Sequence, residues 1–283
     1  MFGLDRQSYY RKIKRIKKRQ NLAEQVVELV QKIRVYQKRI GTRKLYYLLE
    51  NELKSLKIGR DKFFDILRAN HLLIKPKRNY HTTTMSFHRF RKHLNIIKNL
   101  KINRPNQVWV SDITYIGKRE KPCYLSLITD VYSKKIVGFE VSDTMCANQV
   151  VKALFMAQKQ RKTKQSLIHH SDRGVQYCAD DYQYFLTKYK IKCSMTEKSD
   201  PYENAVAERV NGILKQEFMI DTYHLDLSMM KKIVAEAIQI YNNDRPHWSN
   251  FMLTPNQMHT QKNMNYKTYK TKKISSNLLA TTD

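Results

Sequence analysis

The sequence has few cysteines and no long apolar run, and both absences limit what the protein can be. Its four cysteines, at positions 123, 146, 178 and 193, form no C-x-x-C pair, which argues against a disulfide framework and a zinc ribbon. No run of 18 apolar residues occurs, and residues 1–5 lack a signal peptide's apolar stretch, which argues against a membrane protein. We therefore expect a cytosolic protein in which Cys123 and Cys193 serve as small core residues.

Acidic residues are also scarce, and their distribution is uneven. The 283 residues hold 53 Lys and Arg against 25 Asp and Glu, a formal net charge of +28. Residues 1–106 carry +21 of this excess, whereas residues 107–261 carry only +3. An excess of this size favours a polyanionic partner, nucleic acid before membrane. We expect residues 1–106 to grip phosphates, while the nearly neutral residues 107–261 keep carboxylates for a metal.

The N-terminal residues 1–78 are expected to form a basic, all-helical region. Residues 6–40 predict a helix, with an apolar stripe from Val26 to Ile33 at helical spacing. Gly41 is expected to end it, Thr42 to cap a second helix, and Asp61 to cap a third. Short helices joined by a tight turn suit a helix-turn-helix, and a basic helical bundle that touches only phosphates is the alternative. The candidate DNA contacts are Arg43, Lys44, Arg60 and Lys62. A basic linker follows over residues 79–106.

From residue 107 the pattern changes to an α/β order. Three β-rich runs at 107–116, 122–131 and 135–142 precede a helix at 147–160 and a strand at 166–170. A helix at 180–189, a strand at 191–195 and helices at 203–218 and 228–243 complete the domain. Three antiparallel strands followed by alternating helices and strands is the RNase H-like order. This domain is expected to span 107–261, before a basic tail at 262–283.

Three acidic residues stand in distinctive contexts within this domain. Asp112 lies in the first predicted strand, Asp172 follows the strand at 166–170, and Glu208 lies on a helix with 35 residues between it and Asp172. In the predicted sheet the two aspartates come from neighbouring parallel strands, so their side chains are expected to meet. Mg²⁺ prefers carboxylate and water oxygens, and two such ions activate a nucleophile and stabilise a leaving oxyanion in phosphodiester chemistry. These three residues are the candidate catalytic and metal-binding residues.

The helix that carries Glu208 has two faces. Asn204, Glu208, Asn211 and Lys215 fall on one polar face, and Val206, Val210 and Ile213 form an apolar face that can dock on the sheet. Asn204 and Lys215 are candidate DNA contacts, although an ordinary solvated face has the same appearance. Asp130 is expected to cap a turn. His169 and His170 are expected to be structural, with substrate contact as the alternative.

These residues resemble the second-frame (OrfB) transposases of the IS-three class of bacterial insertion sequences, whose cores are of the retroviral integrase type. The resemblance rests on the Trp109–Tyr115 strand, the His170–Tyr177 motif, the Pro201–Lys215 stretch and the downstream Tyr241–His247 segment. It implies a DDE polynucleotidyl transferase that uses two Mg²⁺, with Mn²⁺ as an alternative ion. Such an enzyme nicks the terminal repeats of its element to free a 3′-hydroxyl and joins that hydroxyl to target DNA through circular intermediates.

The same resemblance implies partners and a location. It predicts a homo-oligomer on double-stranded DNA and no membrane contact. The product of an upstream reading frame, joined by programmed frameshifting, is a further expected fusion or partner. The predicted location is the bacterial cytoplasm, associated with the nucleoid.

Two rival functions fit parts of the pattern. A non-catalytic DNA-binding regulator derived from a transposase would share the basic region, but it has no need of three converging carboxylates. A ribonuclease H would share the core fold, but the basic N-terminal region and the stretch from Asp172 to Glu208 fit transposition better.

Overall fold

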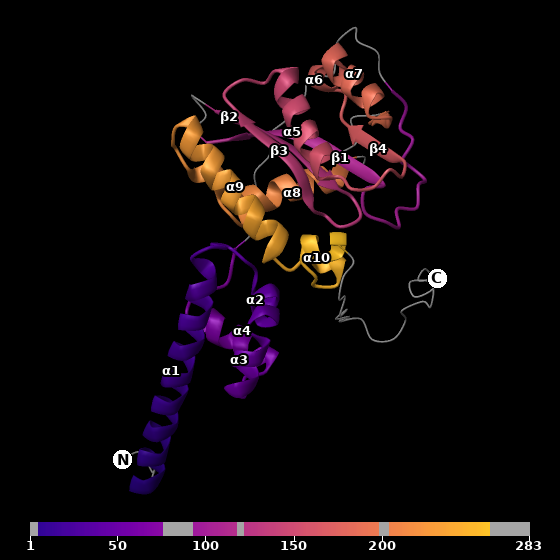
Figure 1. Ribbon diagram of the computed structural model, residues 1–283. Helices are drawn as coiled ribbons and strands as arrows, with labels where there is room; N and C mark the ends of the chain where they lie inside the picture. The colour runs from indigo at the N-terminus through magenta and orange to yellow at the C-terminus, as the bar shows by residue number, and fades with distance from the viewer. Residues whose placement is uncertain (1–4, 76–92, 118–121, 198–203, 261–283) are drawn as a thin grey trace.

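The computed structural model describes residues 5–75, 93–117, 122–197 and 204–260, which form a helical region and a sheet region. The helical region consists of a long helix that projects from the rest and three shorter helices beside it (Figure 1). These are α1 (Arg6–Arg34), α2 (Thr42–Leu48), α3 (Glu50–Ser55) and α4 (Arg60–Ala69). The expected N-terminal helical region is thus present.

Only the second half of α1 carries the apolar stripe, and only this half is covered. Val26 and Val30 are fully buried in a cluster with Leu45, Phe63 and Leu67 of the short helices. The first half, which is rich in Lys and Arg, is exposed to solvent. The sequence pattern therefore divides α1 into a packed half and a basic half that the described residues leave exposed.

Three local predictions in this region are wrong in detail. The helix ends at Arg34, six residues before the predicted boundary. Thr42 is the first residue of α2, and Gly41 occupies the N-cap in an extended conformation with ψ of 150°. Asp61 lies in the first turn of α4 after the N-cap Gly59, and its side chain pairs with Arg60 at 2.9 Å. A carboxylate in the first turn still complements the positive end of the helix dipole.

The sheet region has the predicted RNase H-like order. Its strands are β1 (Val108–Ile116), β2 (Cys123–Asp130), β3 (Ile136–Ser142), β4 (Leu167–Ser171) and β5 (Ile191–Met195). They are arranged β3-β2-β1-β4-β5, with β1, β2 and β3 antiparallel and with β4 parallel to both β1 and β5. The helices are α5 (Ala147–Gln160), α6 (Val175–Cys178), α7 (Asp180–Lys188), α8 (Ala205–Gln216), α9 (Leu227–Asn243) and α10 (Pro255–Thr260). Of these, α6 and α10 were not predicted.

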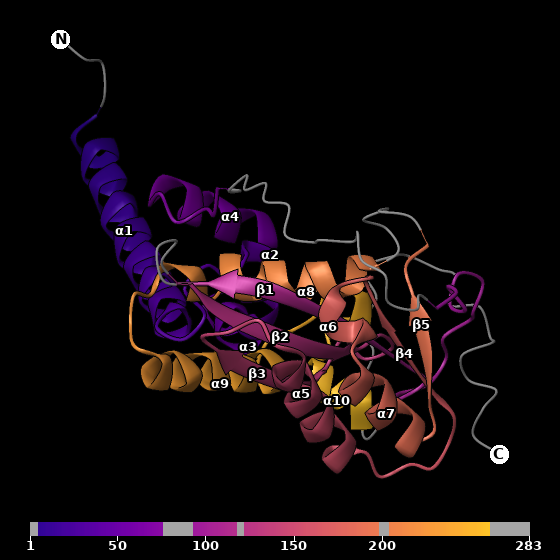
Figure 2. The same ribbon diagram turned by 90° about the horizontal axis from the view of Figure 1, so that it is seen from above.

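Helices cover both faces of the sheet. On one face, Leu125, Leu127 and Val141 pack against apolar residues of α8 and α9. On the other, Trp109, Ile128 and Val137 pack against α5 and α7. Gly138 permits the close approach of β3 to α5, because a Cβ there would lie 2.2 Å from the carbonyl oxygen of Ala153. Asp112 follows the alternation of β1 onto the α8 face, and Figure 2 shows α8 alongside β1.

The segment from residue 93 to β1 lies on the sheet region. Leu94 accepts a backbone hydrogen bond from Met195 at 3.4 Å, and Ile97 and Ile102 pack with Val108 and Val110. The remainder of the predicted linker before residue 93 and the whole of the basic tail at 262–283 lie outside the described residues. Within the described ranges, no helix combines the length and apolar character needed to cross a membrane.

The cysteines agree with the absence of a disulfide framework. All four are free. Cys123 is 8% exposed within the core cluster on the α8 face, as predicted, and Cys193 is half-buried against the opposite cluster.

Candidate active site

The register of two parallel strands brings Asp112 and Asp172 together. Val110 of β1 lies opposite His170 of β4, and each aspartate follows its member of this pair by two residues. Just beyond the end of this ladder the two carboxylates lie near enough for the charge of Asp172 to raise the pKa of Asp112, although 59 residues separate them in the sequence. Asp112 and Asp172 were predicted to lie close together, and the parallel pairing of β1 with β4 explains their proximity.

The environment of Asp112 is unfavourable for an isolated negative charge. Burial, followed by the charge of Asp172, raises the pKa of Asp112 to about 7, and the charge of Glu208 adds to the shift. A hydrogen bond from Asn211 Nδ2 to Asp112 Oδ2, 2.7 Å long, acts in the opposite direction. Carboxylates that crowd one another in this way are stabilised when a cation binds between them.

The loop after β4 holds Asp172 through its own backbone. Asp172 Oδ1 accepts a hydrogen bond of 3.0 Å from the backbone N–H of Gly174. A Cβ at Gly174 would lie 3.1 Å from this oxygen and 3.2 Å from Oε1 of Gln176. A glycine at this position therefore lets the loop approach the carboxylate closely. The sequence analysis assigned no role to Gly174, although it belongs to the His-Ser-Asp-Arg-Gly motif.

Beneath the two aspartates lies a buried tyrosine that the sequence did not single out. Tyr177 on α6 is 1% exposed, and its hydroxyl lies 3.0 Å from Oγ of Ser111 on β1. Burial, followed by the charges of Asp172 and Asp112, raises the pKa of Tyr177 well above its ordinary value, so it stays neutral. It fastens the short helix after Asp172 to the strand that carries Asp112.

Two asparagines fix α8 against the strand that carries Asp112. Asn204, at the N-cap of α8, donates from Nδ2 to the carbonyl oxygen of Ser111 at 3.0 Å. Asn211, seven residues or about two turns of helix after Asn204, donates to Asp112. Both are buried, with 7% and 5% of their surface exposed. Asn211 was placed on the right face by its spacing, but its contact with Asp112 was not predicted. The amide of Asn204 thus donates to the backbone of β1. A contact of Asn204 with DNA stays a prediction.

Glu208 is exposed on α8, and partial burial raises the pKa of its carboxyl. It is near enough to Asp112 to influence that pKa. Within the described ranges, no three His, Cys, Asp or Glu side chains form a group arranged to hold a metal ion. The two aspartates are thus assembled by the sheet, while Glu208 lies near them without completing a three-carboxylate cage.

Lys215 lies two turns beyond Glu208. Its place on a polar helix face suggests an exposed side chain, but the structure shows it half-buried. Burial lowers its pKa, and the charges of Asp221 and Asp112 oppose this shift. The lysine therefore lies within electrostatic range of Asp112.

The four candidate DNA contacts of the helical region differ in exposure. Arg43, Arg60 and Lys62 are exposed, and the guanidinium of Arg43 lies 5.7 Å from the ring centre of Trp248. Lys44 was predicted to contact DNA, but its Nζ lies 2.9 Å from Oε1 of Glu217 and its side chain is only 16% exposed. It is therefore not available as a free phosphate contact. The charge of Lys44 is used within the protein.

The residues that were expected to be structural are structural. His169 and His170 are fully buried, and Nδ1 of His170 lies 2.8 Å from Oγ of Ser194. Burial lowers the pKa of His169 to about 3, so it is neutral. Asp130 is fully buried and accepts hydrogen bonds from the backbone and hydroxyl of Ser133, which confirms its role in the turn between β2 and β3.

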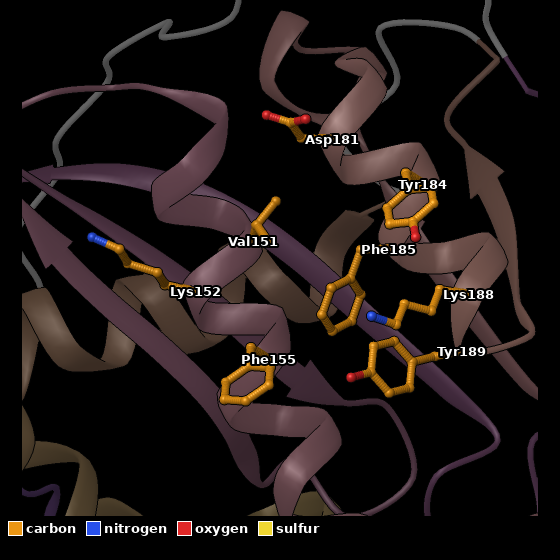
Figure 3. A pocket seen from close by; sticks show the side chains of 8 residues that line it. All are labelled: Val151, Lys152, Phe155, Asp181, Tyr184, Phe185, Lys188 and Tyr189. Atoms are coloured by element: carbon orange, nitrogen blue, oxygen red, sulfur yellow. The ribbon is translucent and has the colours of Figure 1, made fainter.

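A hollow between α5 and α7 lies away from these carboxylates. Its walls include Phe155 of α5 and Tyr184 and Lys188 of α7 (Figure 3). None of the three acidic residues lines it. Since both helices cover the face of the sheet opposite α8, this hollow is not the site of the carboxylate chemistry.

Comparisons with known proteins give one consistent picture. Two models of the integrase core domain family match residues 102–201 and residues 189–255. An insertion element IS600 uncharacterized 31 kDa protein of Shigella sonnei is 34% identical, over 87% of this chain and 92% of its own length. Transposase InsF for insertion sequence IS3fB of Escherichia coli (strain K12) is 32% identical, over 69% of this chain and 68% of its own length.

One solved structure extends the likeness beyond the sheet region. A simian T-cell lymphotropic virus intasome, solved in complex with the PP2A regulatory subunit B56 gamma, is similar with a TM-score of 0.50 and 17% identity. The match covers 83% of this chain and 80% of that one. At this identity the likeness concerns the fold.

Proposed function

Since the chain belongs to the IS3-class insertion-sequence transposases with an integrase-type core, we propose that it cuts element ends and joins them to target DNA at Asp112, Asp172 and Glu208. Cutting would free a 3′-hydroxyl, and strand transfer would use that hydroxyl to attack a second phosphodiester. The observation that supports the proposal most is the β1–β4 register, since Asp112 and Asp172 each follow the last paired residues of these strands by two positions and the charge of Asp172 acts on Asp112.

The donor set fits a hard divalent cation. Asp112 and Asp172 offer carboxylate oxygens, which a hard cation prefers, and the nearby His169 and His170 are fully buried. Mg²⁺ is the proposed ion, with two ions bound and Mn²⁺ as a substitute. Bound there, the ions would lower the pKa of the attacking hydroxyl and stabilise the leaving oxyanion. Glu208 would supply the third carboxylate.

The other residues of the site have supporting roles. Asn211 orients the Asp112 carboxylate through its hydrogen bond, and Gly174 orients that of Asp172. Lys215 would hold a DNA phosphate, since it lies in the last turn of α8 within electrostatic range of Asp112. The exposed basic half of α1, with Arg43, Arg60 and Lys62, would bind the duplex, either by reading a groove or by contacting phosphates alone.

The proposed partners follow from the family. They are double-stranded DNA at the element ends and in the target, further copies of this chain on that DNA, and the product of an upstream frame.

Purified protein incubated with labelled candidate element ends and Mg²⁺ tests the proposal. We expect nicked and joined products in the wild type and none in Asp112→Asn, which keeps the shape of the side chain but loses its charge. Equal product from both proteins would overturn the assignment.

A further inference from the structure

At the C-terminal end of α8, the carboxylate of Glu217 is held by one cation of the sheet region and one cation of the helical region. Arg245, which follows α9, grips it with two nitrogens: Nε lies 2.8 Å from Oε2 and Nη2 lies 2.8 Å from Oε1. From the other side, Nζ of Lys44 on α2 lies 2.9 Å from Oε1 and 3.3 Å from Oε2. Glu217 is the C-cap of α8, so this contact is made by the helix that carries Glu208.

The three charged side chains are withdrawn from solvent. Arg245 is 2% exposed, Glu217 17% and Lys44 16%. Burial tends to raise the pKa of Glu217, but the hydrogen bonds and charges of Arg245 and Lys44 together lower it to about 2. Burial, and then the charge of Arg245, lower the pKa of Lys44 to about 8. The shifts differ because Glu217 faces two cations, whereas Lys44 shares its one anion with a second cation.

Backbone and aromatic contacts strengthen the same junction. The backbone N–H of Arg39 donates to the carbonyl oxygen of Glu217 at 3.0 Å. Nζ of Lys38 lies 4.6 Å from the ring centre of Tyr223, and Arg43 lies over Trp248. The contacts thus come from the short connection between α1 and α2 and from the first turn of α2, and they meet the sheet region at the residues that follow α8 and α9.

Energetics favour a geometric role for this cluster. A buried ion pair often adds little net stability, since desolvation offsets most of the attraction, but a two-nitrogen grip on a carboxylate fixes its orientation. Glu217 lies nine residues after Glu208, roughly 13 Å along the helix axis. Asn211 and Lys215 lie between them on the same helix. A shift of the helical region would therefore be passed to the residues that face Asp112.

We propose that Lys44, Glu217 and Arg245 form a coupling cluster that fixes the DNA-binding helices in one position relative to α8. DNA held by the helical region then reaches Asp112 and Asp172 in one register. Lys44 and Glu217 are accordingly positioning residues, and Lys44 is not a phosphate contact. The functional part of this inference rests on the proposed transposase chemistry, whereas its structural part does not.

Full-length Lys44→Met tests the cluster, since methionine keeps much of the length of lysine but lacks its charge. Lys32→Met is the matched control, because Lys32 belongs to the same region but forms an exposed pair with Glu28. We expect the Arg39 amide to exchange with deuterium about tenfold faster in Lys44→Met than in the wild type. We also expect strand transfer to fall about tenfold, while DNA affinity stays within about twofold. The control should match the wild type in all three measurements, and Lys44→Arg should recover most of the loss.

Three outcomes would overturn the inference. The first is wild-type exchange at Arg39 in Lys44→Met. The second is wild-type strand transfer, and the third is a loss of DNA affinity as large as the loss of strand transfer, which would make Lys44 a phosphate contact. If Lys44→Met does not fold, Glu217→Gln replaces it and carries the same expectations, because the amide keeps the size of the side chain and loses its charge. Failure of the proposed function would give a different result. Asp112→Asn would then remain active, while the Arg39 amide would still exchange faster in Lys44→Met than in the wild type.

Discussion

The helical region and the sheet region use their charges in opposite ways. The ion pairs formed within the helical region lie at the surface, with side chains of Lys32 and Lys54 69% and 71% exposed, and only Lys44, which pairs with Glu217 of the sheet region, is withdrawn from solvent among the described ion pairs of these helices. In the sheet region, Arg245 and Asp130 are 2% and 0% exposed, and each is held by a partner from elsewhere in the chain. Exposed pairs contribute little to folding, whereas buried ones impose a geometry.

This contrast teaches what each group of charges is for. The exposed cations of α1 are not required to hold the fold, so they are available to a polyanion. The carboxylates that face α8 are crowded together at a cost to the folded state, which is reasonable only if a cation joins them. The predictions that follow separate these two uses, from the largest expected effect to the smallest.

The largest effect is expected from the acidic residues. Asp172→Asn and Glu208→Gln should each slow cleavage and joining by roughly 100-fold or more, since a lost metal ligand removes several kcal/mol of transition-state stabilisation. DNA affinity should remain within a few fold, because the exposed cations are unchanged. A binding titration with labelled element ends measures the DNA affinity, and an assay of the same DNA with Mg²⁺ measures the rates of cleavage and joining. A variant that reacts at the wild-type rate would remove that residue from the site.

Asn211 should tune the metal without binding DNA. Asn211→Ala removes the hydrogen bond to Asp112 and should weaken Mg²⁺ binding by about 10- to 100-fold, as is typical of residues that orient a metal ligand. Titration calorimetry measures this directly. Asn211→Ser serves as the control that keeps a polar group. An unchanged affinity for Mg²⁺ in Asn211→Ala would show that Asp112 is held in place by other contacts.

Neutral substitutions on α1 should weaken DNA binding and leave the chemistry intact. Lys14, Lys17 and Lys18 are exposed, and changing all three to Gln should lower affinity about tenfold and reduce the salt slope by up to about 3. The matched control changes Lys159, Lys162 and Lys164 to Gln, three exposed lysines of the sheet region. Fluorescence anisotropy over a series of salt concentrations gives the slopes. Equal slopes in the two triple variants would contradict the division between the regions.

The smallest effect is a pH-dependent change in stability without metal. The raised pKa of Asp112, about 7 against an ordinary 3.8, means that the folded chain binds this proton more tightly than the unfolded chain. The resulting stabilisation is present below the ordinary pKa and is lost as the pH rises towards 7. Metal-free Asp112→Asn should therefore melt a few degrees above the wild type at pH 8, with no difference near pH 3. A lower melting temperature for the variant at pH 8 would refute the crowding of the carboxylates.

Local sequence pattern predicted most of the sheet region. The bounds of α5 and β5 match the predicted ones, because apolar periodicity and polar turns define both elements clearly. The pairing of Asp112 with Asp172 followed from the fold class, since that class fixes which strands are neighbours.

The contacts that organise the site could not be predicted in the same way. Asn211 and Asp112 are 99 residues apart, and Lys44 and Glu217 are 173 apart. From charge alone Lys44 resembled a phosphate contact, because nothing in its local sequence indicates the carboxylate that approaches it in the folded chain. Helix ends such as Arg34 also depended on packing, since the residues after it remain compatible with a helix.

One measurement tests the division between the two regions most directly: Mg²⁺-dependent strand transfer at a DNA concentration that saturates both Asp112→Asn and the α1 triple variant. The account predicts no joined product from Asp112→Asn and a wild-type rate from the α1 variant, because saturation removes the need for high affinity. Joined product from Asp112→Asn, or an equal loss in both variants, would contradict it.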